Sequence, residues 1–275
     1  MLQRRAGDSA HLASLLAAPW LERALEDDRT RRLFAGNSKA VRKEATEAWA
    51  VIGQVRHVLR ELGLPTDGAG ATLLDVCSGK GMTALCLAME FPRARVVMLD
   101  SNGDMDLGHC RAVDNLRFEQ VDLFARDAAD ALTACARGGR GCIAIGMHLC
   151  GALAPRLLTL AARCQAVDAA VVCPCCLKGS LKEEVRREAA RAGGDAVAQH
   201  YPVLMQKLAE LVQEEGADAD GSDPSPNGLV LEEGGDEDGG GRVMSVSLAW
   251  DAEMLSPKNG FVRALKVRSD VAQRA

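Results

Sequence analysis

A glycine-rich turn is the first feature of this 275-residue sequence that could bind a ligand. Residues 74–81 read LDVCSGKG, which predicts a strand that ends in a tight turn, and a helix is expected from Met82 to Glu90. Glycine lets the backbone approach a ligand closely, and the N–H groups at the start of a helix are available to bind it. Because such turns also join strands to helices without binding anything, this segment alone does not identify a ligand.

Acidic residues close the next two expected strands. Asp100 lies nineteen positions after Gly81, at the end of a strand expected over 95–100, and Asp122 ends the strand expected near 116–121. The first carboxylate could accept both hydroxyls of a ribose, and the second could accept from an adenine amino group. Each acid could instead cap a helix. Since the carboxyl ends of parallel strands meet at one edge of a sheet, we predict a nucleoside-containing ligand there.

Histidine and cysteine follow the fourth and fifth expected strands. Residues 148–151 read HLCG after a strand expected over 141–147, and residues 173–176 read CPCC at the end of one expected over 168–173. These two strands should be neighbours, so both segments should lie beside the predicted ligand. His148 is the first candidate to remove a proton from an acceptor or to orient it by a hydrogen bond. A buried histidine bonded to a backbone carbonyl is the alternative.

The pattern of apolar residues places these motifs on alternating strands and helices. Residues 1–65 have helical spacing, and from Ala71 short apolar runs alternate with amphipathic stretches, which is typical of repeated βα units and a parallel sheet. A helix is expected after each of the five strands, the last over 180–215. Two further strands, expected over 243–250 and 261–267, are joined by a short link and must therefore be antiparallel.

These elements predict one α/β domain with a helical extension. We expect the extension over residues 1–68 and a Rossmann-like doubly wound sheet, closed by a C-terminal antiparallel hairpin, over residues 69–275. Residues 214–241 are rich in Gly, Asp and Glu and predict a flexible acidic insertion. Ten acidic residues and no Lys or Arg lie from Glu214 to Asp238, so the net charge of −5 becomes +5 for the rest of the chain.

The glycine turn resembles a known motif. Residues 75–81 resemble the D-x-G-x-G-x-G motif of class I S-adenosylmethionine-dependent methyltransferases, with Cys77 in place of the first glycine. Asp100 and Asp122 match the ribose-binding and adenine-binding acids of that family, whereas a nicotinamide-binding domain would carry G-x-G-x-x-G. The resemblance implies S-adenosylmethionine as the cofactor. The residues it implies for cofactor binding are Asp75, Cys77, Gly79, Gly81, Asp100, Ser101 and Asp122.

The HLCG and PCC segments, with SPKN at 256–259, resemble a narrower methyltransferase group that includes eukaryotic tRNA 2′-O-methyltransferases. This similarity covers about residues 71–268 and implies an enzyme that methylates RNA, with a tRNA-like substrate. The residues expected to face the acceptor are His148, Cys150, Cys175 and Cys176. A protein or small-molecule methyltransferase is the alternative enzyme, and a non-catalytic cofactor-binding partner subunit is the alternative outside enzymes.

Three interpretations of the cysteines stay open. A nucleophilic Cys175 or Cys176 would suit covalent methylation of a pyrimidine carbon. A metal site could form from His148, Cys150 and two of the three cysteines in segment 173–176, but the C-x-C-C spacing differs from the usual C-x₂-C, so we assign no metal. In the third interpretation, small soft side chains only pack around the cofactor.

The overall composition is that of a globular protein, with 48% hydrophobic and 26% charged residues. No run approaches the roughly 18 apolar residues of a membrane span, and the short apolar run near the N-terminus lacks a cleavage site of the signal-peptide type. We therefore expect a cytoplasmic or nuclear protein, not bound to membranes, whose ten cysteines are reduced. The sequence does not indicate an oligomeric state.

Overall fold

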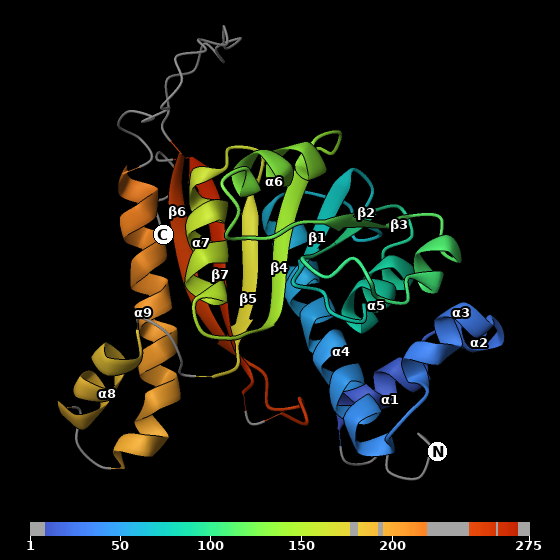
Figure 1. Ribbon diagram of the computed structural model, residues 1–275, viewed down its shortest axis with the longest axis horizontal. Helices are drawn as coiled ribbons and strands as arrows, with labels where there is room; N and C mark the ends of the chain where they lie inside the picture. The colour runs from blue at the N-terminus through green and yellow to red at the C-terminus, as the bar shows by residue number, and fades with distance from the viewer. Residues whose placement is uncertain (1–8, 177–180, 192–194, 219–241, 257, 269–275) are drawn as a thin grey trace, which may run out of the picture.

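A seven-stranded sheet with the strand order β3-β2-β1-β4-β5-β7-β6 forms the centre of the molecule (Figure 1). The computed structural model describes residues 9–176, 181–191, 195–218, 242–256 and 258–268. The strands are β1 Ala71–Val76, β2 Arg95–Asp100, β3 Leu116–Gln120, β4 Gly141–Leu149, β5 Ala169–Pro174, β6 Arg242–Trp250 and β7 Gly260–Arg268. Strands β1 to β5 are parallel, and β7 is antiparallel to β5 and β6. The predicted doubly wound sheet with a C-terminal antiparallel hairpin is confirmed.

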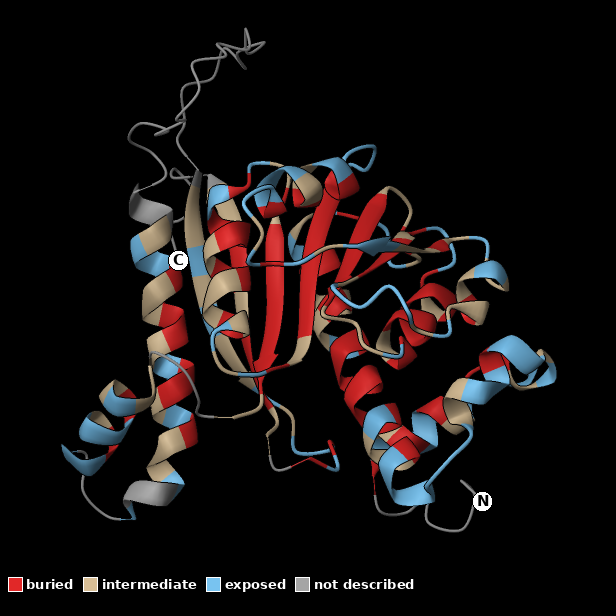
Figure 2. Ribbon diagram, viewed as in Figure 1, coloured by how far each residue is buried: buried red, intermediate tan, exposed pale blue. Residues whose placement is uncertain are grey.

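Helices cover both faces of this sheet (Figures 1 and 2). The described helices are α1 Ala10–Leu16, α2 Leu21–Glu26, α3 Asp28–Arg31, α4 Ser38–Glu61, α5 Met82–Glu90, α6 Ala128–Ala136, α7 Leu153–Arg163, α8 Lys182–Arg191 and α9 Ala196–Asp218, with 3₁₀ turns at Arg32–Phe34 and Gly108–Arg111. Successive strand residues point to opposite faces. Leu73 therefore packs in one core with α4 and α5, whereas Leu74 packs in the other with α6, α7 and α9.

The N-terminal helices pack against the same face as α5. Helix α4 is capped by Asn37, whose side chain accepts from two backbone N–H groups, and its apolar stripe is buried against the sheet and α5. The ring of Trp20 stacks on Trp49 with 6.3 Å between centroids, and its Nε1 donates to Glu90 of α5 at 2.8 Å. The N-terminal half of α4 lies close to the carboxyl end of β4, since Glu47 contacts His148 there. The boundary expected at residue 68 stays a prediction.

The prediction was wrong at the β2–β3 connection. A helix was expected there, and only the 3₁₀ turn Gly108–Arg111 forms. Side chains in this segment bind nearby backbone N–H groups instead: Asp100 binds Asn102, Asn102 binds Asp104, and Asp106 binds Gly108, each at 3.0 Å. Such local bonds compete with helix formation.

Two further boundaries differ at the C-terminal side. The helix expected over 180–215 is two helices, α8 and α9. Residues 214–218 of the predicted acidic insertion lie in α9, and 219–241 lie outside the described residues.

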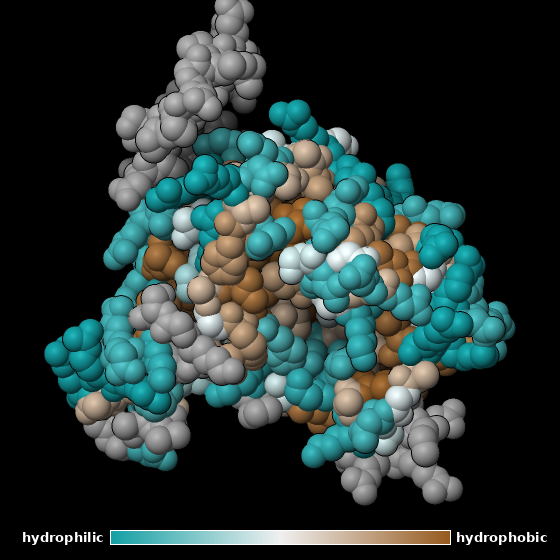
Figure 3. All heavy atoms as spheres, viewed as in Figure 1, coloured by the Kyte–Doolittle hydropathy of each residue, from teal (hydrophilic) through white to brown (hydrophobic). Residues whose placement is uncertain are grey.

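The surface is mainly hydrophilic on the face shown in Figure 3, and hydrophobic side chains appear chiefly near its centre, over α7 and the neighbouring strands. Within the described ranges, none of the helices combines the length and apolar character that crossing a membrane requires.

Candidate functional site

The turn between β1 and α5 is held in a left-handed backbone conformation at three residues: Cys77 (φ 55°), Gly79 (φ 52°) and Gly81 (φ 87°). A Cβ on Gly81 would lie 2.6 Å from both Met98 Cε and His109 Nε2, so this position requires glycine. Among the residues that the structure describes, none has a heavy atom within 4 Å of a Cβ placed on Gly79. The turn therefore leaves open space beside Gly79, directly before α5 begins at Met82.

Cys77 keeps the conformation that a glycine in its place would adopt easily. A left-handed conformation costs a residue with a Cβ roughly 1–2 kcal/mol, and glycine pays about 0.5–1 kcal/mol in entropy instead. We expect Cys77→Gly to be as stable as the unaltered protein or more stable by up to about 1 kcal/mol, as measured by urea denaturation. The control Cys110→Gly lies outside the positive-φ residues and is expected to destabilise. A clear loss of stability in Cys77→Gly would show that Cys77 is not strained.

A cavity of about 310 Å³ lies between this turn, α4 and the end of β4. Its lining residues are Glu44, Glu47, Asp75, Cys77, Ser78, Gly79, Lys80, Gly81, Met82, Thr83, Met147 and His148. Three carboxyl groups face one lysine and one histidine there. The balance of charge favours a ligand with cationic groups.

Asp75 is the most unusual residue of the cavity. Its side chain is buried, and its Oδ2 has no hydrogen-bond partner among the residues that the structure describes. Burial, together with the charge of Asp100, raises the pKa of Asp75 to about 7 although the N–H of Ala84 opposes this shift. Ser78 Oγ is likewise buried without a partner in the described part of the chain. Buried polar atoms are normally satisfied, so a ligand donor would complete both groups.

The other predicted cofactor residues lie along the same edge but are not part of the cavity lining. Asp100 ends β2, and its two carboxylate oxygens accept from the N–H groups of Gly79 and Asn102, each at 3.0 Å. Ser101 is exposed and follows directly. Asp122 does not end β3 as expected, because the strand stops at Gln120; its Oδ1 instead accepts from the Phe124 N–H at 2.9 Å in the following turn.

The three acids nevertheless all affect the pKa of one residue of the turn, Cys77. Burial, together with the charges of Asp100, Asp75 and Asp122, raises the pKa of Cys77 to about 12. The Cys77 thiol therefore stays protonated near neutral pH, and the predicted acidic groups surround the turn.

His148 lies in β4 rather than after it, at a bulge where its φ is 59°. Its Nε2 is 2.7 Å from Glu47 Oε1 and 3.0 Å from Lys43 Nζ, and Lys43 is 2.6 Å from the same Glu47 oxygen. Burial opposes ionisation of Glu47, but its contacts with His148 and Lys43 outweigh burial and lower its pKa. The three side chains join α4 to the end of β4.

Glu47 is a residue that the sequence analysis missed. It is 2% exposed and lies between the buried residues Thr46 and Ala48 of α4. An acidic residue on the buried stripe of an amphipathic helix was the available signal, since a buried charge needs a partner.

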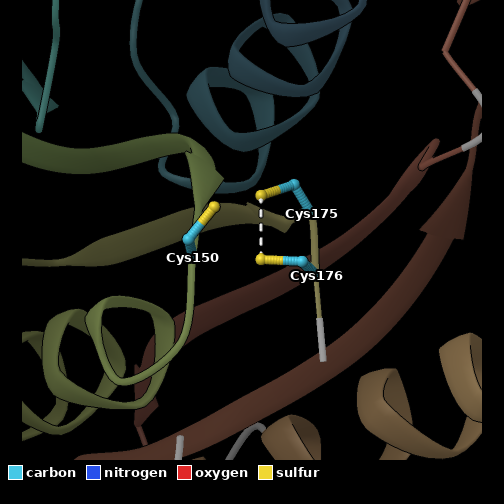
Figure 4. Close-up of side chains that lie close together, drawn as sticks. All are labelled: Cys150, Cys175 and Cys176. Carbon is cyan, nitrogen blue, oxygen red and sulfur yellow. Dashed lines mark hydrogen bonds between the residues drawn. The ribbon is translucent and has the colours of Figure 1, made fainter. Parts of the chain in front are cut away.

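The predicted cysteine cluster forms only in part. The sulfur atoms of Cys150, Cys175 and Cys176 lie within 4.8 Å of one another (Figure 4), whereas Cys173 is buried and its thiol donates to the Lys258 carbonyl at 3.4 Å. The His148 side chain does not belong to this group in the described residues. Burial and the neighbouring thiols raise the pKa of Cys175, which disfavours a nucleophilic thiolate at this position.

Known proteins resemble this chain in its sequence. A family model described as a methyltransferase domain matches residues 43–183. The ribosomal RNA small subunit methyltransferase G of Xanthomonas euvesicatoria pv. vesicatoria is 34% identical over 106 residues, which cover 34% of this chain and 49% of that protein. The protein of the same name from Pseudomonas aeruginosa is 49% identical over 49 residues, which cover 18% of this chain and 23% of that protein. The chain thus spans half or less of the length of these curated relatives.

Solved structures resemble it at low identity. Aeropyrum pernix fibrillarin with bound S-adenosyl-L-methionine has a TM-score of 0.43 and 10% identity, over 78% of this chain and 74% of that one. Human N-acetylserotonin methyltransferase in complex with SAM has a TM-score of 0.40 and 11% identity, over 96% of this chain and 69% of that one.

Proposed function

Because the chain belongs to the methyltransferase-domain family whose model matches residues 43–183, we propose that it transfers a methyl group from S-adenosylmethionine to RNA. The observation that carries the cofactor assignment is Asp75, a buried carboxyl group that lines an acidic cavity with one oxygen lacking a partner among the described residues. S-adenosylmethionine, when bound, supplies a methyl group already activated on a sulfonium. Its ammonium group would satisfy Asp75 Oδ2, and its positive charge suits the cavity.

The rest of the predicted cofactor site is compatible with this placement. Gly79 leaves space for a ligand to approach the backbone. Each carboxylate oxygen of Asp100 accepts one backbone N–H, and its second lone pair remains for a ribose hydroxyl. Asp122 is exposed at the end of the same edge, where it could bind the adenine amino group. These residues would hold the donor, and the chain's remaining task is to align the acceptor.

His148 is the residue that we assign to acceptor alignment. It lines the cavity, and the contacts of its Nε2 with Glu47 and Lys43 fix the ring at the carboxyl end of β4. A fixed imidazole edge would orient an incoming hydroxyl or amino group toward the methyl donor. Glu47 and Lys43 are then positioning residues that act through His148.

Substitution of His148 should therefore affect turnover more than cofactor binding. We expect His148→Ala to lower kcat by about 100-fold, the effect of losing acceptor alignment, and to weaken S-adenosylmethionine binding much less. Glu47→Gln should lower kcat by a smaller factor. The matched control is His57→Ala, a histidine of α4 that does not line the cavity. Equal losses in kcat and in cofactor affinity would contradict the assigned role.

Two observations support RNA as the acceptor. The curated relatives are named as ribosomal RNA methyltransferases. The chain outside the acidic segment Glu214–Asp238 has a net charge of +5, which favours contact with phosphates. The HLCG and PCC segments, by their resemblance, suggest a tRNA-like substrate within this class.

The test is methyl transfer from isotopically labelled S-adenosylmethionine to pools of tRNA and ribosomal RNA. We expect label in an RNA fraction that ribonuclease removes, and RNA binding that weakens as salt rises. Label found in protein or in small molecules would show that one of these, and not RNA, is the methyl acceptor. If the protein binds the cofactor but releases no S-adenosylhomocysteine with any of these pools, it is a non-catalytic subunit.

A further inference from the structure

Three cysteines meet at the carboxyl ends of β4 and β5. Cys150 directly follows β4, and Cys175 and Cys176 directly follow β5, which pairs with β4. Their side chains point toward one another (Figure 4). The Cys175 and Cys176 sulfur atoms are 3.7 Å apart, and all three sulfurs lie within 4.8 Å of one another. The proposed function assigns no chemistry to this arrangement.

The spacing of the sulfur atoms matches a tetrahedral metal site. Two thiolates bound to zinc at about 2.3 Å and tetrahedral angles lie about 3.8 Å apart. Cys175 and Cys176 already have this separation. Cys150 is exposed in the turn after β4, and its sulfur needs to move closer by at most about 1 Å. We propose that Cys150, Cys175 and Cys176 bind one zinc ion through three thiolates and leave its fourth position open.

The chemistry of the cluster favours a soft divalent cation. Three thiols with no oxygen or carboxylate among the grouped ligand atoms select zinc over magnesium or calcium. Burial and the two neighbouring thiols raise the pKa of Cys175, and a bound cation would reverse this preference. On binding, each S–H bond is replaced by a Zn–S bond, and the three protons pass to the solvent.

The backbone beside the cluster is held firmly. The buried Tyr201 hydroxyl donates to the Pro174 carbonyl at 2.9 Å and accepts from the Gly260 N–H at 3.2 Å. These bonds fix the end of β5, immediately before two of the three cysteines, to the start of β7. Supported ligands lose less entropy when a metal binds, as in other metal sites whose ligands are oriented by hydrogen bonds.

An open coordination position would have a use at this place. Zinc sites with three protein ligands commonly bind water or substrate at the fourth position. Cys150 is two residues from His148, so the zinc would lie on the side of the cavity that we assign to the acceptor. This role rests on the proposed function, whereas the zinc site itself does not.

The experiment uses the full-length reduced protein after removal of metals with a chelator, and the probes are Zn²⁺ and Co²⁺ alone. We expect one zinc ion per chain by elemental analysis, and a sulfur-to-cobalt charge-transfer band in the near ultraviolet on titration with Co²⁺. Cys150→Ser is expected to weaken zinc binding by more than about 100-fold, the upper end of what a supporting residue costs. The matched control Cys110→Ser, another incompletely buried cysteine, should bind as the unaltered protein does.

Cys150 is the first variant because it is exposed, so its replacement should not impair folding. Cys176→Ser is the second, and a circular dichroism melt checks each protein. Absence of stoichiometric zinc, or a cobalt band that persists in both variants, would overturn the proposal. Neither measurement needs cofactor or RNA, so a negative result here is distinguishable from failure of the proposed function.

Discussion

Between pH 4 and pH 8 the protein is expected to lose about 4 kcal/mol of stability relative to its Asp75→Asn variant, because the pKa of Asp75 is about 7 in the folded state and about 4 in the unfolded chain. Between about pH 4 and pH 7 the folded protein keeps the proton on Asp75, whereas the unfolded chain releases it. Unfolding then releases a proton, so rising pH favours the unfolded state. Below pH 4 both states are protonated, and the difference disappears.

Urea denaturation of both proteins across this pH range measures the effect. The comparison with Asp75→Asn is needed because Glu47 and Asp251, whose pKa values are lowered, change stability in the opposite direction. Saturating S-adenosylmethionine should reduce this pH-dependent loss of stability, since its cationic groups would stabilise the ionised carboxylate of Asp75 in the cavity. A difference that does not vary with pH would contradict the buried, unpartnered state of Asp75.

Gly81→Ala is expected to lower the free energy of unfolding by about 2–5 kcal/mol, the sum of left-handed strain and overpacking. Its new Cβ would lie 2.6 Å from Met98 and from His109, both of which are buried. Gly79→Ala is the matched comparison, because its Cβ meets no atom of the described part of the chain within 4 Å, so that only the backbone strain remains. It should cost about 1–2 kcal/mol in stability and, by filling the open space, also weaken cofactor binding.

Urea denaturation of the two glycine variants separates these effects. Equal losses of stability at the two positions would contradict the packing around Gly81. Normal cofactor affinity in Gly79→Ala would show that the space beside Gly79 is not used by the cofactor.

The sheet was predictable because its central strands β1, β2, β4 and β5 are mainly short apolar runs bounded by turn residues. All six residues of β1 are buried, as expected for a central parallel strand, and four of them are apolar. The short link before β7 fixed the antiparallel direction of the last pair. The β2–β3 connection was missed because its Asp and Asn side chains bind the local backbone, an effect that apolar spacing does not reveal.

The candidate site was predictable where it depends on strand ends and was missed where it depends on packing between distant elements. Asp75, Gly79 and His148 were placed correctly at one edge, since parallel strands bring their carboxyl ends together. Glu47 reaches this edge only because α4 packs against the sheet, a contact across about a hundred residues of sequence. Cys173 is likewise buried inside β5, whereas Cys175 and Cys176 come after the strand ends at Pro174 and are only partly buried, a difference that depends on where the strand ends.

Calorimetric titration of the purified protein with S-adenosylmethionine measures whether the sheet edge at Asp75, Gly79 and Asp100 binds this cofactor. We expect saturable binding at one site per chain. Binding should be at least about 100-fold weaker in Asp100→Ala, because two charge-assisted hydrogen bonds of about 1.5 kcal/mol each are lost. Asp130→Ala, which removes an exposed acid from α6, should bind as the unaltered protein does. No binding by the unaltered protein, or equal binding by Asp100→Ala, would contradict the cofactor site.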